Sequence, residues 1–236
     1  LFRSSISAVL LPVFSGMDKG DGMSNETLVV WNSALLKSAK LIFPMLIFSV
    51  FFAEPIMTCM YGDIYAQSSI YFVIKNLSGL FYIIPFYPII LAIGKTNSYA
   101  NAHMIAAFMI VMAEYVVCKT FDSAVYVAIT SELCKLFKIW LLLRVIANYA
   151  HKKITELLPP RPMTILIMIS VLASLPPFLL LDFLNMNKFI VLFVCLGFFL
   201  VDYYVLCWIC KVTYRDIAGG FLKNKSRLNA VVKILP

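Results

Sequence analysis

Long apolar stretches recur along the chain and are separated by short polar connections. Six of them have about 19 to 25 residues, and about 20 residues at 1.5 Å each cross a hydrocarbon core of about 30 Å. Backbone groups in lipid must be hydrogen-bonded within their own segment, so we predict helices and not strands. The expected spans are 41–60, 70–94, 99–118, 121–144, 163–181 and 188–210.

The chain starts with Leu1 and is already apolar over 6–14. We interpret residues 1–16 as the end of a further helix, which makes the sequence a fragment and raises the expected number of transmembrane segments to about seven. The predicted fold class is therefore an all-α integral membrane protein, a polytopic helix bundle.

Basic residues divide unequally between the two alternating sets of connections. One set, together with Arg144, holds 14 of the 20 Lys and Arg residues; the other, together with Lys188, holds two. Cytoplasmic loops carry the excess of Lys and Arg, so the first set and the C-terminus are predicted to be cytoplasmic. The first set is 16–40, 95–98, 145–162 and 211–236; the second is 61–69, 119–120 and 182–187.

Composition supports the same class. Hydrophobic residues make up 62% of the chain and charged residues 14%, against roughly half and a quarter in soluble domains. The formal charge of +8 could suggest nucleic acid. We reject that reading because the basic residues fall in short patches between apolar runs, and we expect no nucleic-acid partner.

Catalytic and metal-binding patterns are weak in this sequence. His103 and His151 have no Cys, Asp or Glu at metal-ligand spacing. Cys207 and Cys210 have redox spacing, but they end an apolar helix and are interpreted as small hydrophobes. The predicted external loops are too short for a catalytic domain, so we expect no enzyme activity and no cofactor.

Ionisable residues inside the predicted spans are a sharper signal, because charges facing lipid cost several kcal/mol. Glu132 lies near mid-membrane, and Lys135 and Lys138 follow at i+3 steps on one broad helix face. Pairing between helices or snorkelling to an interface is one explanation, and a substrate or ion pathway is the other. The pathway candidates are Glu132, Lys135, Lys138, Lys75 and Glu54; Glu114 and Asp202 are the other acids at this depth.

Prolines predict a distortion in the segment 70–94, where Pro85 and Pro88 each remove a backbone donor and clash with the preceding turn. We expect a bend near Pro85. We also expect Glu132 and Lys135 to face the protein interior or a cavity, and 163–210 to form a hairpin somewhat apart from the main bundle.

Six short motifs occur in order along the chain. Together they resemble the C-terminal half of an O-antigen (Wzx-type) oligosaccharide flippase of the multidrug/oligosaccharidyl-lipid/polysaccharide exporter superfamily. One departure is Phe121-Asp-Ser-Ala124, where the family often has Gly-x-x-Gly-Ala. The motifs are Ile6-Ser-Ala-Val-Leu-Leu-Pro-Val-Phe-Ser15, Lys37-Ser-Ala-Lys-Leu-Ile-Phe-Pro44, Tyr61-Gly-Asp-Ile-Tyr65, Gly94-Lys-Thr-Asn97, Thr130-Ser-Glu132 and Glu156-Leu-Leu-Pro159.

The resemblance implies the C-terminal lobe of a 12–14-helix transporter that flips undecaprenyl-diphosphate-linked oligosaccharides across the bacterial inner membrane by alternating access. It implies a cationic cavity between two lobes and coupling to an ion gradient. Its partners would be the lipid-linked substrate, membrane lipids and a missing N-terminal lobe. The expected parts are a transporter lobe at 1–147, a basic cytoplasmic loop at 148–162, two additional helices at 163–212 and a basic cytoplasmic tail at 213–236.

Three alternatives remain at this point. The chain could export a drug or another lipid-linked precursor within the same superfamily. It could be a membrane-embedded polymerase or acyltransferase, against which the short external loops argue. It could also be a helical membrane scaffold without a substrate.

Overall fold

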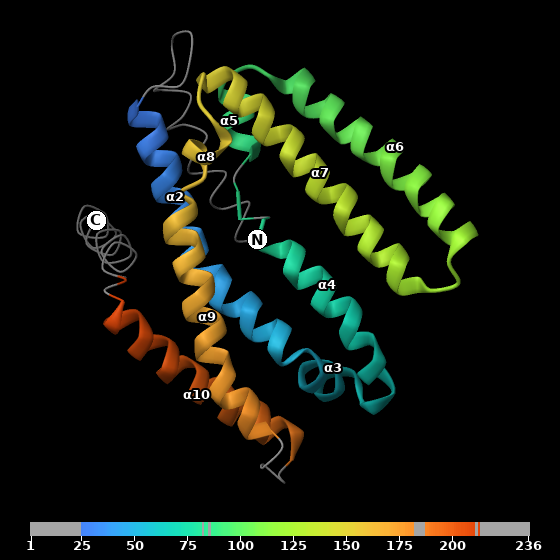
Figure 1. Ribbon diagram of the computed structural model, residues 1–236, viewed down its shortest axis with the longest axis vertical. Coiled ribbons are helices and arrows are strands. Elements are labelled where there is room, and N and C mark those ends of the chain that lie inside the picture. The colour runs from blue at the N-terminus through green and yellow to red at the C-terminus, as the bar shows by residue number, and fades with distance from the viewer. Residues whose placement is uncertain (1–24, 82, 85, 182–186, 211, 213–236) are drawn as a thin grey trace, which may run out of the picture.

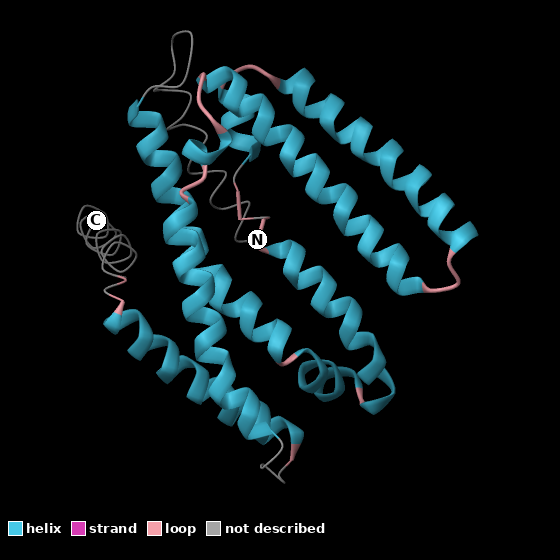
Figure 2. Ribbon diagram, in the orientation of Figure 1, coloured by secondary structure: helices cyan, strands magenta, loops and turns pink. Residues whose placement is uncertain are grey.

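The computed structural model describes residues 25–81, 83–84, 86–181, 187–210 and 212. This part of the chain consists of helices joined by turns and loops (Figure 2). The predicted helix end at 1–16 and the tail 213–236 lie outside the described residues. The elements are α2 Asn25–Phe51, α3 Ala53–Tyr61, the 3₁₀ helix η1 Asp63–Ser68, α4 Ser69–Gly79, α5 Phe86–Ala92, α6 Thr96–Thr120, α7 Ala124–Ala150, α8 Ile154–Leu157, α9 Pro160–Leu180 and α10 Lys188–Ile209.

Four described helices are long and apolar enough to cross a membrane, namely α2, α6, α9 and α10. The structure therefore supports the all-α membrane class, while the described residues do not confirm the expected number of seven spans. The segment 121–144 forms most of α7, which has 27 residues but carries charges along its length. The segment 70–94 is divided between α4 and α5.

Helix α2 corrects the first expected loop. We assigned residues 16–40 to a cytoplasmic connection, but the helix begins at Asn25. Trp31, Leu35, Ala39 and Phe43 recur every four residues and are at most 2% exposed, so one face of this segment is a core face. The polar residues between them lowered the local hydropathy and hid the helix.

The boundary between α2 and α3 lies at Phe52, three residues before Pro55. Proline cannot donate to the carbonyl four residues earlier, and its ring crowds that carbonyl. The backbone nevertheless continues, because Phe52 N–H donates to Phe48 and Ile56 N–H donates to Phe52. The expected span 41–60 is thus the last part of α2 plus a redirected α3.

The predicted bend in 70–94 is a complete break. Helix α4 ends at Gly79 and α5 begins at Phe86, so the interruption starts before Pro85, which lies outside the described residues. Tight turns close the end of α4, where Leu80 N–H donates to Leu77 and Phe81 N–H to Ser78. Gly79 faces Leu46 of α2, and a Cβ there would lie 3.2 Å from the leucine side chain. A small residue at this point lets the two helices approach closely.

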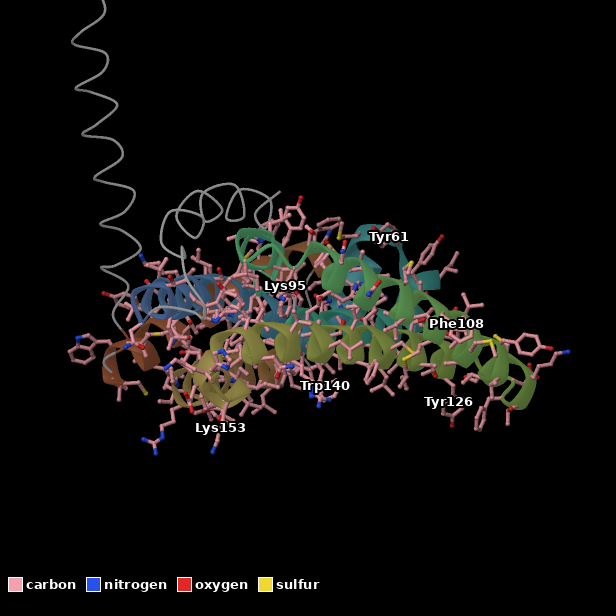
Figure 3. The ribbon with its side chains drawn as sticks, turned by 90° about the horizontal axis from the view of Figure 1, so that it is seen from above. Tyr61, Lys95, Phe108, Tyr126, Trp140 and Lys153 are labelled. Atoms are coloured by element: carbon pink, nitrogen blue, oxygen red, sulfur yellow. The ribbon has the colours of Figure 1, made fainter. Side chains whose placement is uncertain are left out.

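The helices lie side by side in a shallow layer (Figures 1 and 3). Helices α6 and α7 form an antiparallel pair, α4 packs on α7, and α2 packs on both α4 and α9. The turns α3–α4 and α6–α7 lie at one end of the layer, where α9 also ends and α10 begins, and the connections α5–α6 and α7–α9 lie at the other (Figure 1). The connections 95–98 and 145–162 of the first set inferred from charge therefore lie at the end opposite to 61–69 and 119–120 of the second set.

The C-terminal hairpin of α9 and α10 does not stand apart as expected. Helix α9 packs along α2, and the residues buried between α2, α9 and α10 form one apolar cluster. Phe48 and Phe52 of α2 enter this cluster beside Ala173 of α9 and Cys195 and Phe199 of α10. Wide apolar faces on all three helices make this contact, which helix boundaries alone did not reveal.

Candidate functional site: a buried carboxylate between two lysines

Glu132 lies about two turns into α7, on the side that packs against α4. Glu132 is only 8% exposed, whereas the neighbouring Leu133 is 58% exposed. The expectation that Glu132 faces the protein interior is confirmed. Burial of a carboxylate is costly unless charge and hydrogen bonds compensate for the lost water.

Three side chains donate hydrogen bonds to the carboxylate of Glu132. Lys135, one turn further along α7, lies 2.7 Å from Oε1, and Lys75 of α4 approaches the same oxygen at 3.3 Å. Ser78 of α4 donates its hydroxyl to Oε2 at 2.6 Å. The group Lys75, Ser78, Glu132 and Lys135 is called the charged cluster below.

The position of α4 in the charged cluster follows from sequence spacing. Lys75 and Ser78 are three residues apart, so both lie on the face of α4 that meets α7. Ser78 is the penultimate residue of α4, so the cluster sits where the helix breaks. A broken helix at membrane depth leaves backbone groups that nearby side chains or water must satisfy, and such breaks commonly line a cavity.

The charged cluster has an excess of positive charge, because two ammonium groups share one carboxylate. Lys135 is the less exposed of the two, at 29% of its side chain, while Lys75 is 62% exposed. The half-buried Lys135 and Glu132 form an internal pair. Lys75, with the more exposed side chain, is the ammonium group that an anion from outside the cluster can approach.

Lys75 lies on the wall of a groove of about 490 Å³ between α3, η1 and α4. Tyr61, Tyr65 and Tyr71 line the same groove, and the rings of Tyr61 and Tyr65 are 5.7 Å apart. The groove is called the tyrosine groove below. It gives aromatic surface and phenol hydroxyls beside an ammonium group.

The remaining predicted residues occupy separate places. Lys138 is half-buried further along α7, and Glu54 is exposed on α3, on the wall of a different cavity. Glu114 of α6 accepts a hydrogen bond from Ser131 of α7, so it joins those two helices. Asp202 is half-buried on α10. The structure thus joins Glu132, Lys135 and Lys75, and separates Glu54 from them.

Sequence reasoning missed Ser78 and the tyrosines. Ser78 could have been found from its i+3 spacing to Lys75 next to a predicted distortion. The tyrosines are scattered over three elements, and only packing brings them together. Among the described residues, no three His, Cys, Asp or Glu side chains are placed to hold a metal ion.

In comparisons with known proteins, no family model matches the chain, and no curated protein or solved structure matches it significantly. Helix lengths and apolar surface indicate a helical membrane protein, and the charged cluster is an ionic site between two of its helices. Its specific role is a proposal that rests on that geometry and on the sequence motifs.

Proposed function

We propose that the chain is the C-terminal part of a Wzx-type flippase, which moves undecaprenyl-diphosphate-linked oligosaccharides across the bacterial inner membrane by alternating access. The observation that carries this proposal is the charged cluster at the break between α4 and α5. The motifs that resemble the family support this substrate class, and the positive excess of the charged cluster supports binding of the diphosphate there.

The charged cluster suits a diphosphate. Glu132 holds Lys135 in position, and the more exposed Lys75 can exchange Glu132 for a phosphate oxygen. Such an exchange keeps every charge paired, so the energy lost with the Glu132 contact is replaced by the contact with substrate. Binding would therefore loosen α4 from α7, which is a step that alternating access requires.

The tyrosine groove suits the sugars of the same substrate. Phenol hydroxyls donate and accept hydrogen bonds, and the ring faces offer flat apolar surface. Because Lys75 lines this groove and also belongs to the charged cluster, a diphosphate at Lys75 would place the attached sugar along the tyrosines.

The break between α4 and α5 supplies a hinge for the motion. Rigid half-helices joined by a short irregular segment can tilt separately, as in transporters with discontinuous helices. Gly94, two residues after the end of α5, has a φ of 69°, a left-handed conformation that glycine adopts without strain, so α5 stops sharply at its C-terminal end.

Complementation of a flippase-deficient bacterial strain tests the proposal. The variant Glu132→Gln, in the full-length flippase, should abolish transport while membrane abundance stays normal, because the exchange partner of Lys75 is lost. Lys75→Gln should also abolish it. Lys119→Gln serves as a control, because this exposed lysine lies at the end of α6, away from the charged cluster. Full activity of both cluster variants would contradict the proposal.

Two native cysteines test the proposed orientation. Cys118 and Cys210 are both exposed, near the end of α6 and just after α10 respectively. With the C-terminus in the cytoplasm, a membrane-impermeant maleimide added outside should label Cys118 and leave Cys210 unlabelled until the membrane is permeabilised. Single-cysteine variants allow the labelling of Cys118 and of Cys210 to be measured separately. The reverse labelling pattern would overturn the proposed orientation.

A further inference from the structure

A second cavity of about 720 Å³ lies between α3, η1, α9 and α10. Phe51, Phe178, Leu181 and Val191 form apolar walls, and Glu54, Asp63 and Lys188 bring charge to the same space. The end of α9 and the start of α10, which contribute to its lining, meet at one end of the layer (Figure 1). The volume is in the range of small-molecule sites. We call it the end cavity.

The charges of the end cavity are unequal. Asp63 of η1 and Lys188 of α10 form an ion pair that joins the two elements across the cavity. Glu54 adds a second carboxylate, so the described charged residues on the wall sum to −1. A site with this balance favours a ligand that carries a cation and also an anionic group able to reach Lys188.

Glu54 lies in the first turn of α3 and reaches the wall of the end cavity. An ionised carboxylate beside apolar walls is costly unless water or a cation reaches it. The apolar walls lie beside it, so a bound cation there must belong to a molecule that is also apolar.

We propose that the end cavity binds the headgroup of one aminophospholipid, phosphatidylethanolamine, from the membrane leaflet at that end. Its ammonium group meets Glu54, its phosphate meets Lys188, and the first part of its acyl chains lies against Phe51 and Phe178. The lipid spans η1, α3, α9 and α10, and so fastens the C-terminal hairpin to the α3–α4 turn. This site is separate from the charged cluster and holds whether or not the chain is a flippase.

Native mass spectrometry of the 236-residue chain tests this proposal, with the protein released from bilayers that contain equal amounts of phosphatidylethanolamine and phosphatidylglycerol. The wild type should retain one phosphatidylethanolamine in preference to phosphatidylglycerol. Glu54→Gln should lower its retention about tenfold, because a charge-assisted hydrogen bond is lost. Lys188→Gln should lower retention of both lipids, because both carry the phosphate.

Two control variants keep the measurement specific. Glu114→Gln removes an acid at membrane depth on α6, and Lys119→Gln removes an exposed lysine at the same end of the layer, both outside the cavity. Each should retain phosphatidylethanolamine like the wild type. Circular dichroism must show equal helix content in all variants. A competing arm with water-soluble glycerophosphoethanolamine should displace little lipid, since it lacks the chains that contact the apolar walls.

Equal retention of the two lipids by the wild type would overturn the proposal. So would unchanged retention in Glu54→Gln, and so would displacement by glycerophosphoethanolamine at equal concentration, which would show that the apolar walls contribute nothing. A variant that loses helix content would be replaced by Glu54→Asp, which keeps the charge on a shorter side chain and should retain the preference for phosphatidylethanolamine. Loss of that preference in Glu54→Asp would overturn the proposal.

Discussion

Hydrogen bonds and ion pairs between polar side chains connect α4, α6 and α7, whereas packed aromatic side chains connect α2, α9 and α10. In the first region Lys75 and Ser78 reach Glu132, and Ser131 donates to Glu114. In the second region Phe48 stacks on Phe52 at 4.4 Å between ring centroids and meets Phe199 at 5.0 Å. We call them the polar region and the aromatic region.

The different contacts indicate which of the two regions can move. Lipid tails are as apolar as side chains, so helices in a membrane associate through close packing and polar contacts rather than through the hydrophobic effect. Ring packing is short-ranged and is lost when helices separate. A carboxylate between two lysines can exchange partners while its charge stays paired. We therefore expect the aromatic region to act as a fixed support and the polar region to move.

The largest expected effect is in the aromatic region. Phe52→Ala removes a ring with 0% exposure and leaves a cavity between α2 and α9, so unfolding free energy should fall by about 3 kcal/mol. Phe193→Ala, at a position on α10 that is 70% exposed, is the matched control and should change it by less than about 0.5 kcal/mol. Reversible unfolding in bicelles measures both. Equal effects would mean that these rings do not support the region.

The second-largest effect is expected in the charged cluster. It is measured as the coupling energy between two residues in a double-mutant cycle. Glu132→Gln with Lys135→Gln should give a coupling of about 2 kcal/mol, because both groups are largely shielded. Glu132→Gln with Lys75→Gln should give about 0.5 kcal/mol, because Lys75 is 62% exposed and screened by solvent. The reverse order would show that Lys75 is the structural partner and would weaken its role in exchange.

A buried hydrogen bond connects α2 of the aromatic region to the segment after α7. The indole N–H of Trp31 in α2 donates to the carbonyl of Leu157 in α8 at 2.9 Å, and both residues are fully buried. Trp31→Phe leaves that carbonyl without its donor, so stability should fall by about 1.5 kcal/mol. Thermal unfolding measures it against Trp140→Phe, at a position that is 42% exposed and should change little. A change no larger than in that control would show that the bond does not fasten α8 to α2.

The smallest effect is expected at the ion pair of Asp63 and Lys188, whose side chains are 78% and 57% exposed. Asp63→Asn should lower stability by about 0.5 kcal/mol in low salt, and by nothing measurable in 1 M NaCl, because exposed pairs are screened. Thermal midpoints over a salt series give the result. A loss of several degrees that persists at high salt would indicate a larger structural role.

Much of the helical architecture could be predicted from hydrophobic pattern alone. The predicted spans 163–181 and 188–210 agree closely with α9 and α10, because unbroken apolar runs of that length have few other solutions. The predicted start of this helix at 41 was wrong, because α2 is amphipathic near its beginning and the average hydropathy there is low. The break after Gly79 was foreseen only as a bend, since proline spacing indicates distortion without its extent.

Hydrophobic pattern and charge were enough to predict the membrane class, the alternation of connections and the residues whose charge must be compensated, because each follows from the energy of apolar and charged groups in lipid. The contact of Glu132 with Lys75 across 57 positions, the part of Ser78 in it, and the packing of α9 and α10 on α2 depend on how the helices fold together. Local energies place a residue on a helix face. Which face meets which depends on the packing of side chains far apart in the chain, and no single segment encodes that.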